Sequence, residues 1–288
     1  MLLPIPWWNT LKRCENIKAE VITPSILKTL NNSLITKSRL LMEKKTDLNS
    51  AFLTDIQKSF NRFIKSKTSR STAKLKPLHG RIAEDLATKL GEGYKIWSQG
   101  YGEKREKEMK GRYMDKMVDI VVQDVKSGKD VAGVGVKFVM QNYSQNSNNY
   151  FESMLGETAN LRTAGFPYFQ VFIILDELPY YKQSKEISKW ESFTSHNARK
   201  YYNLSADNVD AYWHTPNKTL IYVVRVEPSI PKDCEDLDAY CRFYTEQIDN
   251  IKVINSPQVY SGFKKDGTVI LNDYATFIDK VYHAIMAL

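Results

Sequence analysis

The stretch "MVDIVVQDVKSGKDVAGVGVKFV", residues 117–139, contains two apolar runs separated by a short polar segment. Both runs are rich in valine, a composition typical of β-strands. The polar segment between them, "VKSGKD", places Ser127-Gly128 where a tight hairpin turn needs a small residue followed by glycine. The sequence therefore predicts an antiparallel hairpin with strands at 117–124 and 131–139.

Each predicted strand carries one charged side chain inside its apolar run, Asp119 in the first and Lys137 in the second. Ionised groups in such surroundings cost free energy unless they are paired or used. A turn at Ser127-Gly128, or one centred on Gly128, places Asp119 opposite Val136 or Lys137, and only the second register puts both side chains on one face. Two interpretations stay open: a structural cross-strand pair, or a pair that takes part in chemistry.

The segments around the hairpin alternate between helical and strand-like patterns. Helices are expected at 24–66, 77–90, 147–162, near 186–200, near 236–250 and at the C-terminal end, with further strands at 94–99, 169–177 and 219–227. This order predicts an α/β fold whose mixed central sheet contains the antiparallel hairpin and is flanked by helices. Residues 1–76 are expected to form a helical N-terminal extension with a basic stretch, and 77–288 the main domain, although one continuous domain is also compatible.

The positive charge of the chain is concentrated in one segment. The net charge is +8, and no acidic residue occurs between Asp55 and Glu84. The basic residues of that segment are Lys58, Arg62, Lys65, Lys67, Arg70, Lys74, Lys76 and Arg81. Localised positive charge favours a polyanionic partner, because neutralised phosphates release counterions. The same composition is also typical of a linker.

Several classes of protein are disfavoured by what the sequence lacks. The longest apolar run, 171–175, is far too short for a bilayer span, and the start of the chain does not resemble a signal peptide. Three cysteines without a CxxC pair disfavour a zinc site or a disulfide framework, so a reduced, cytoplasmic protein is expected. No phosphate-binding loop, dinucleotide fingerprint, GxSxG or HExxH motif occurs, so no nucleotide cofactor is expected.

Asp119, the hairpin and Lys137 late in the return strand, framed by helices at 78–90 and 147–162, resemble the PD-(D/E)xK nuclease superfamily. Type II restriction endonucleases are the best-populated group of that superfamily, and the resemblance covers roughly residues 78–176. It implies a restriction-endonuclease-like core in a nuclease catalytic domain at 77–288. It also implies Mg²⁺-dependent, sequence-specific hydrolysis of phosphodiester bonds in double-stranded DNA. Cutting both strands of a palindrome needs two copies of the site, so a homodimer is implied as well.

The resemblance assigns roles to the two charged strand residues. Asp119 corresponds to the aspartate that binds Mg²⁺, and Lys137 to the lysine that positions or activates the attacking water. The family pattern also has an acidic residue two positions before the lysine, on the same face of the strand. That position is Gly135 in this chain. The second metal ligand must therefore come from elsewhere.

Some restriction enzymes take that carboxylate from the helix after the lysine strand, where this chain offers Glu152 and Glu157. Five residues separate them, so they lie roughly 140° apart around a helix and are not expected to reach one site together. Glu152 is the expected ligand because it is closer to Lys137, with Glu157 in reserve and a surface position as the alternative for it. Glu84 on the preceding helix is a further catalytic candidate, although a solvated position beside Asp85 is the simpler interpretation.

Two segments are candidates for DNA contact. The basic stretch supplies Lys65, Lys67, Arg70 and Lys74 for phosphates. The amide-rich segment "NYSQNSNNY", 142–150, is expected as a loop beside the catalytic strand, where Asn and Gln can read adenine. Its candidate contact residues are Asn142, Ser144, Gln145, Asn146, Asn148 and Asn149. A flexible loop that caps a helix at Ser147 is the alternative. The charged segment 103–116 is either a second backbone contact or a solvated helix face.

Two rivals to a type II restriction enzyme remain open. One is another nuclease of the same superfamily that acts in repair or recombination. The other is a DNA-binding protein that has the nuclease fold but lacks activity, which the glycine at position 135 makes a serious alternative.

Overall fold

The structure is a computed structural model that describes residues 24–68 and 72–288. The chain divides into two compact units, residues 1–44 and 45–288, and helix α1 (Pro24–Ser66) begins in the first and ends in the second. This division falls earlier in the chain than the boundary expected after residue 76. The physical reason is that Phe52, Ile56 and Phe60 of α1 are completely buried in the core of the second unit.

A mixed sheet of seven strands forms the centre of the second unit, which confirms the expected α/β fold class for the described residues. The path runs β1-β4-β5-β6-β9-β10, with β11 paired to β9. β1, β4 and β5 are antiparallel neighbours, whereas β5, β6 and β9 run parallel. The strands are β1 (Tyr94–Ser98), β4 (Ile120–Asp124), β5 (Asp130–Val139), β6 (Tyr168–Leu175), β9 (Lys218–Glu227), β10 (Lys252–Asn255) and β11 (Val269–Leu271).

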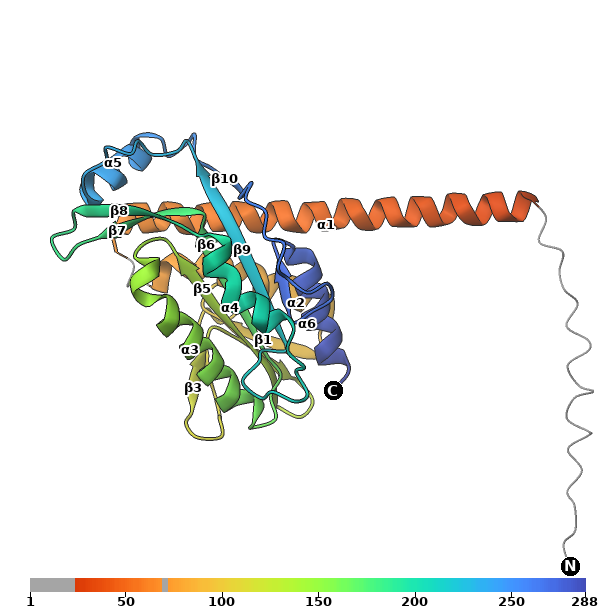
Figure 1. Cartoon of the computed structure of the whole chain (residues 1–288). Helices are drawn as coiled ribbons and strands as arrows, with labels where there is room; N and C mark the ends of the chain where they lie inside the picture. The colour runs from red at the N-terminus through yellow and green to blue at the C-terminus, as the bar shows by residue number, and fades with distance from the viewer. Residues whose placement is uncertain (1–23, 69–71) are drawn as a thin grey trace, which may run out of the picture. The chain divides into compact units, whose positions relative to one another are not determined.

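Helices pack on both faces of this sheet (Figure 1). Successive side chains of β6 point to opposite faces: the ring of Phe172 meets Tyr143 of α3 at 6.4 Å, and the ring of Phe169 meets Phe277 of α6 at 6.5 Å. Helix α2 lies against α6 and β1. The helices are α2 (Lys76–Leu90), α3 (Tyr143–Arg162), α4 (Ser195–Ser205), α5 (Leu237–Glu246) and α6 (Tyr274–Met286), with a short 3₁₀ helix at Thr72–Leu75.

The hairpin β4–β5 forms as predicted, but its register differs. Ile120 lies opposite Val134, so the register continues to place Asp119 beside Gly135 rather than Val136 or Lys137. The turn is longer than expected, because the pairing closes at Gln123 and Asp130, and a bulge follows within β5. Lys137 lies two positions beyond Gly135, so it shares a face with the aspartate even in this register.

The amide-rich segment is helical, which corrects the prediction of a loop at 142–150. Helix α3 begins at Tyr143 instead of near Ser147. Asn142 adopts a left-handed conformation, and its side chain bonds both the amide and the carbonyl of Tyr181. Tyr143 is buried against the sheet. These tertiary contacts start the helix one turn before the sequence offers a good N-cap.

Two further segments differ from prediction. The expected helix near 186–200 is a strand, β8 (Ile187–Ser192), followed by α4, because Thr194 and Asn197 form a capping box that fixes the helix start. β8 pairs with β7 (Glu177–Tyr181). The charged segment 103–116 contributes a second small hairpin, β2 (Lys107–Met109) with β3 (Lys116–Val118), and not a helix face.

No helix in the described ranges is both long enough and apolar enough to span a membrane.

Helix α2 approaches the turn after β1 backbone to backbone. A Cβ on Gly100 would lie 2.1 Å from the carbonyl oxygen of Lys76 and 2.4 Å from the amide nitrogen of Gly80. A side chain there must push the helix and the turn apart. Gly93 has open space around its Cβ position and no positive φ.

We expect Gly100→Ala to lower the free energy of unfolding by about 1–3 kcal/mol, the usual cost of overpacking. Gly93→Ala is the matched control and should leave it nearly unchanged. Urea unfolding followed by circular dichroism measures both. Equal midpoints for the two variants would contradict the close approach of α2.

Candidate metal centre and active site

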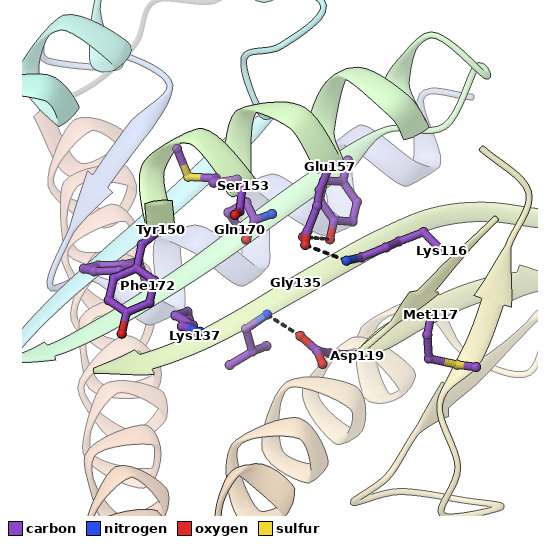
Figure 2. A pocket seen from close by; sticks show the side chains of 13 residues that line it. Lys116, Met117, Asp119, Gly135, Lys137, Tyr150, Ser153, Glu157, Gln170 and Phe172 are labelled. Carbon is purple, nitrogen blue, oxygen red and sulfur yellow. Dashed lines mark hydrogen bonds and ion pairs between the residues drawn. The ribbon is translucent and has the colours of Figure 1, made fainter. Parts of the chain in front are cut away.

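A cavity of about 300 Å³ is lined by residues of β3, β5, β6 and α3, together with Asp119. Figure 2 shows Asp119 and Lys137 on the strand side and Glu157 descending from α3 toward them. The side of the cavity formed by β6 carries Tyr168 and Gln170. The hairpin and α3 therefore bring together the aspartate, the lysine and one glutamate that the sequence singled out.

Asp119 sits in the short gap between β3 and β4, where the chain leaves one small sheet and enters the large one. Its Oδ2 accepts a hydrogen bond of 2.7 Å from the amide of Val136. Burial raises the pKa of Asp119 to about 6, opposed by that hydrogen bond; Glu157 raises it further, whereas Lys116 and Lys137 lower it. The carboxyl group thus retains a proton at a pH where an exposed aspartate has lost it.

Lys137 and Glu157 approach the cavity from different elements. The Lys137 ammonium lies 4.6 Å from the centroid of the Tyr150 ring, a cation–π contact that directs the exposed lysine along α3. Glu157 accepts a 2.6 Å hydrogen bond from Lys116, and the Tyr168 hydroxyl lies 3.5 Å from its other oxygen. Both contacts hold the carboxylate over the sheet.

Packing in the folded chain explains why position 135 is occupied by glycine. A Cβ there would lie 2.7 Å from the Tyr168 hydroxyl and 2.9 Å from the side-chain oxygen of Gln170. These two side chains from β6 fill the space above the glycine. The Gln170 side-chain nitrogen is buried and has no hydrogen-bond partner among the described residues. An amide donor therefore faces this region unsatisfied.

A second group of ligand-type atoms shares Asp119. One ligand atom each of His79, Glu106 and Asp119 lie within 4.8 Å of one another, a spacing at which these residues can hold a metal ion. His79 is completely buried, its Nε2 lies 3.8 Å from Asp119 Oδ1, and neither ring nitrogen has a hydrogen-bond partner among the described residues.

The protonation states of this group suit a cation. Burial lowers the pKa of His79 to about 4, so the imidazole is neutral at neutral pH and keeps a lone pair. The pKa of Glu106 is raised, first by burial and then by Asp119. Buried polar atoms are nearly always paired, and a bound cation would satisfy His79 and reduce the repulsion between the carboxylates.

Sequence reasoning missed His79 and Glu106. His79 follows Leu78 on the apolar side of the predicted helix, and a histidine on that face was the available signal. Glu106 lies among charges of both signs, which resembles a solvated surface. The pairing of β2 with β3 carries that segment back to the aspartate, and no local pattern reveals it.

The remaining candidate carboxylates lie elsewhere. Glu152 is exposed on α3 and interacts with Lys200 rather than lining the cavity. Glu84 is exposed on α2, 3.5 Å from Arg81, and borders a different hollow. The preference for Glu152 assumed that nearness along the chain to Lys137 decides which glutamate reaches the site. Because α3 begins a turn earlier and runs across the sheet, Glu157 is the one above Asp119.

The candidate DNA-contact residues divide into three groups. Lys65 is exposed, Lys67 pairs with Asp238 at 2.5 Å, Lys74 is buried, and Arg70 lies outside the described residues. Four residues of the amide-rich segment are engaged within the chain: Asn142 with Tyr181, Ser144 with Glu191, Gln145 with Asn142, and Asn146 with the carbonyl of Asn142. The exposed candidates are Ser144, Gln145, Asn148 and Asn149.

A basic groove leads to the cavity. Three adjoining hollows all include Lys76, and together they are lined by the cations Lys58, Arg62, Lys65, Lys74, Lys76, Arg81, Lys104 and Arg105. The last of these hollows shares Met117 with the cavity of Asp119. No carboxylate of the described residues forms an ion pair with Lys65, Lys76 or Lys104. Their charge is available to a polyanion.

No protein-family model matches the chain, and searches of curated proteins and of solved structures found no match. The chemistry of the site must therefore be inferred from its own residues.

Because the pKa of Asp119 is raised, the free energy of unfolding is expected to depend on pH. Between the ordinary value of 3.8 and about 6 the folded chain holds the proton more tightly than the unfolded chain, so stability falls as the pH rises through this window. Asparagine is never charged. We expect Asp119→Asn to stabilise the metal-free protein above about pH 6, with the gain disappearing below about pH 4. Thermal unfolding in a chelator across this range measures the effect, and a gain that does not depend on pH would contradict it.

Metal binding by His79, Glu106 and Asp119 can be tested with two nearby glutamates, Glu106 directly before β2 and Glu108 within it. Glu106→Gln removes a ligand charge and should weaken binding of Mn²⁺ about tenfold or more, in line with the loss of a coordinating or supporting group. Glu108→Gln removes the same charge from an exposed position and should leave binding nearly unchanged. Calorimetric titration with Mn²⁺ compares them. Equal affinities would exclude Glu106 as a ligand.

Proposed function

We propose that this chain is a Mg²⁺-dependent DNA endonuclease of the PD-(D/E)xK type, with a type II restriction enzyme that works as a homodimer as the specific expectation. The observation that carries the proposal is the convergence of Asp119, Lys137 and Glu157 on one cavity. Each comes from a different element, and each has the charge that cleavage of a phosphodiester requires.

The order of the elements around the cavity supports the proposal. In chain order, helix α2 and strand β1 come first, the small β2–β3 hairpin follows, and then come β4, β5, helix α3 and β6. Strands β1, β4, β5 and β6 are neighbours in the large sheet in that order. This is the frame that the resemblance implied. Fold alone does not establish function, so the weight rests on the site.

The donor atoms suit a divalent cation. Asp119 is central, with Glu157 on the α3 side and with Glu106 and His79 on the α2 side. Carboxylate oxygens are the ligands that Mg²⁺ prefers, and the imidazole widens the choice toward Mn²⁺. When bound, such a cation neutralises the scissile phosphate and lowers the pKa of a coordinated water.

The residues of the chain supply the remaining requirements. Lys137 presents an ammonium group near the carboxylates, where it can hold a water for attack and offset the charge that the transition state gathers. Lys116 keeps Glu157 oriented over the sheet. The unpaired amide of Gln170 offers a donor for a phosphate oxygen. The basic groove, centred on Lys76, provides affinity for the DNA backbone.

One observation favours a second candidate, an inactive DNA-binding protein. Gly135 supplies no carboxylate, and Glu157 is already paired with Lys116 at 2.6 Å. If that pair is permanent, Asp119 has no partner on the α3 side. A repair or recombination nuclease differs from the main proposal only in its products.

We expect purified protein to cut plasmid DNA with Mg²⁺ and not with EDTA, and to give discrete fragments because cleavage is sequence-specific. Asp119→Ala and Lys137→Ala should lower the cleavage rate at least about a hundredfold, the range for loss of a catalytic group. Both should still bind DNA in a gel-shift assay. Binding without any cleavage supports the inactive protein, and a continuous smear supports a non-specific nuclease.

Glu157 and Glu152 form a matched pair on one helix. Glu157→Gln should lower the cleavage rate about a hundredfold, because it removes a charge from the cavity. Glu152→Gln removes the same charge from an exposed position on α3 and should cut like the wild type. If Glu152→Gln loses activity and Glu157→Gln does not, the assignment from the structure is wrong.

A further inference from the structure

Exposed aromatic side chains gather in one region. In the described part of the chain, three aromatic residues are exposed: Tyr113 (73%), Tyr212 (48%) and Trp213 (53%). Tyr113 lies at the tip of the β2–β3 hairpin, and the other two lie in the loop between α4 and β9. Aromatic rings are usually buried, and a group of exposed ones marks an interaction surface.

Asn160, in the last turn of α3, holds the hairpin tip. Its side-chain oxygen accepts hydrogen bonds from the amides of Tyr113 (2.9 Å) and Met114 (3.3 Å), and its side-chain nitrogen donates to the Met114 carbonyl (2.8 Å). A Cβ on Gly111 would lie 2.1 Å from that nitrogen. The tip is therefore fixed on the helix, with Tyr113 pointing outward.

Arg162, two residues further along α3, holds the second loop. Its guanidinium group donates to the carbonyls of Tyr212 (2.8 Å), Thr215 (2.7 Å) and Val209 (2.9 Å). The same group lies 5.2 Å from the centroid of the Trp213 ring. Arg162 is itself buried, so a charged group has been taken out of water to fix a loop that exposes two aromatic rings.

The hairpin adjoins the cavity, and the second loop is held by Arg162, five residues beyond Glu157 on α3. Glu157 precedes Asn160 by a single helical turn. Lys116 and Met117 follow the hairpin tip and line the cavity beside Glu157, as Figure 2 shows. The exposed rings are thus attached to the same helix turn and the same hairpin as the candidate active site.

We propose that Tyr113, Tyr212 and Trp213 stack on DNA bases that are unpaired beside the scissile phosphate. This inference rests on the proposed function, because it assumes that DNA enters the cavity. An aromatic ring offers a flat face that any base can stack on, and such stacking tolerates different sequences.

The charges near the hairpin tip favour a nucleic acid over a protein partner. Lys110 and Arg112 flank the tip, and no carboxylate among the described residues forms an ion pair with either. Arg112 also lies 5.7 Å from the centroid of the Tyr113 ring. A cation beside an exposed ring suits a base and its phosphate together.

The test measures binding of a labelled DNA duplex with a central unpaired thymine tract, by fluorescence anisotropy in a chelator and over a range of salt. Trp213→Ala and Tyr113→Ala should each weaken binding about tenfold, the usual loss for one stacked base. The slope of affinity against salt should stay the same, since no phosphate contact is lost. Trp213→Phe keeps an aromatic face and should bind nearly like the wild type.

Val259→Ala is the control, because Val259 is also exposed but lies on the loop between β10 and β11. Alanine variants that bind as tightly as this control would overturn the inference. The inference would also be overturned if the alanine variants bound DNA as the wild type does but differed from it in oligomeric state in sedimentation. The surface would then be a protein interface. Cleavage is scored separately. If the alanine variants bind DNA weakly and the wild type does not cut, the aromatic surface is supported and the nuclease proposal is refuted. If the wild type cuts and the alanine variants bind DNA normally, the nuclease is supported and the aromatic surface is refuted.

Discussion

The free-energy cost of partly burying the Asp119 carboxylate, whose side chain is 29% exposed, governs the arrangement of this site. The backbone amide of Val136 and the nearby lysines offset part of that cost, and the raised pKa shows that they do not offset all of it. Glu106 and Glu157 add negative charge on either side instead of removing it. A core built only for stability would replace such a group with an apolar one. A divalent cation held there would offset this cost, because it would attract all of the carboxylates that now repel one another.

Gly135 and Glu157 show how a helix, instead of a strand, can supply a carboxylate to this part of the cavity. Because β5 and β6 are parallel with Gly135 beside Gln170, the side chains of β6 lean over the glycine. An acidic side chain on β5 would collide with them. The space above Gly135 can be reached from α3, and Glu157 approaches it from that helix. The glycine on β5 and the glutamate on α3 thus fit one packing arrangement.

The sequence predicted the parts of the fold that local pattern controls. The hairpin, the helices at 77–90 and at the C-terminal end and the buried strands follow from periodicity, and they place Asp119 and Lys137 near each other. Tertiary contacts decided the rest. The turn, flanked by the pair Gln123 and Asp130, lies earlier in the chain than expected and so shifted the register. The bonds of Asn142 to Tyr181 started α3 early, and Glu157 rather than Glu152 lines the cavity. Glu106 reaches His79 and Asp119 through the β2–β3 pairing, which no local pattern reveals.

Helix α3 connects the chemistry to the surface beside it. Within two turns it presents Glu157 to the cavity, Asn160 to the hairpin tip and Arg162 to the loop before β9. These side chains leave the helix in different directions, since residues three and five apart lie about 60° and 140° from one another around its axis. Rotation or translation of this one helix would move a carboxylate and both aromatic loops together. The spacing between the cavity and the exposed rings is therefore set by a rigid element, which is the condition for a surface that positions a substrate relative to a reacting bond.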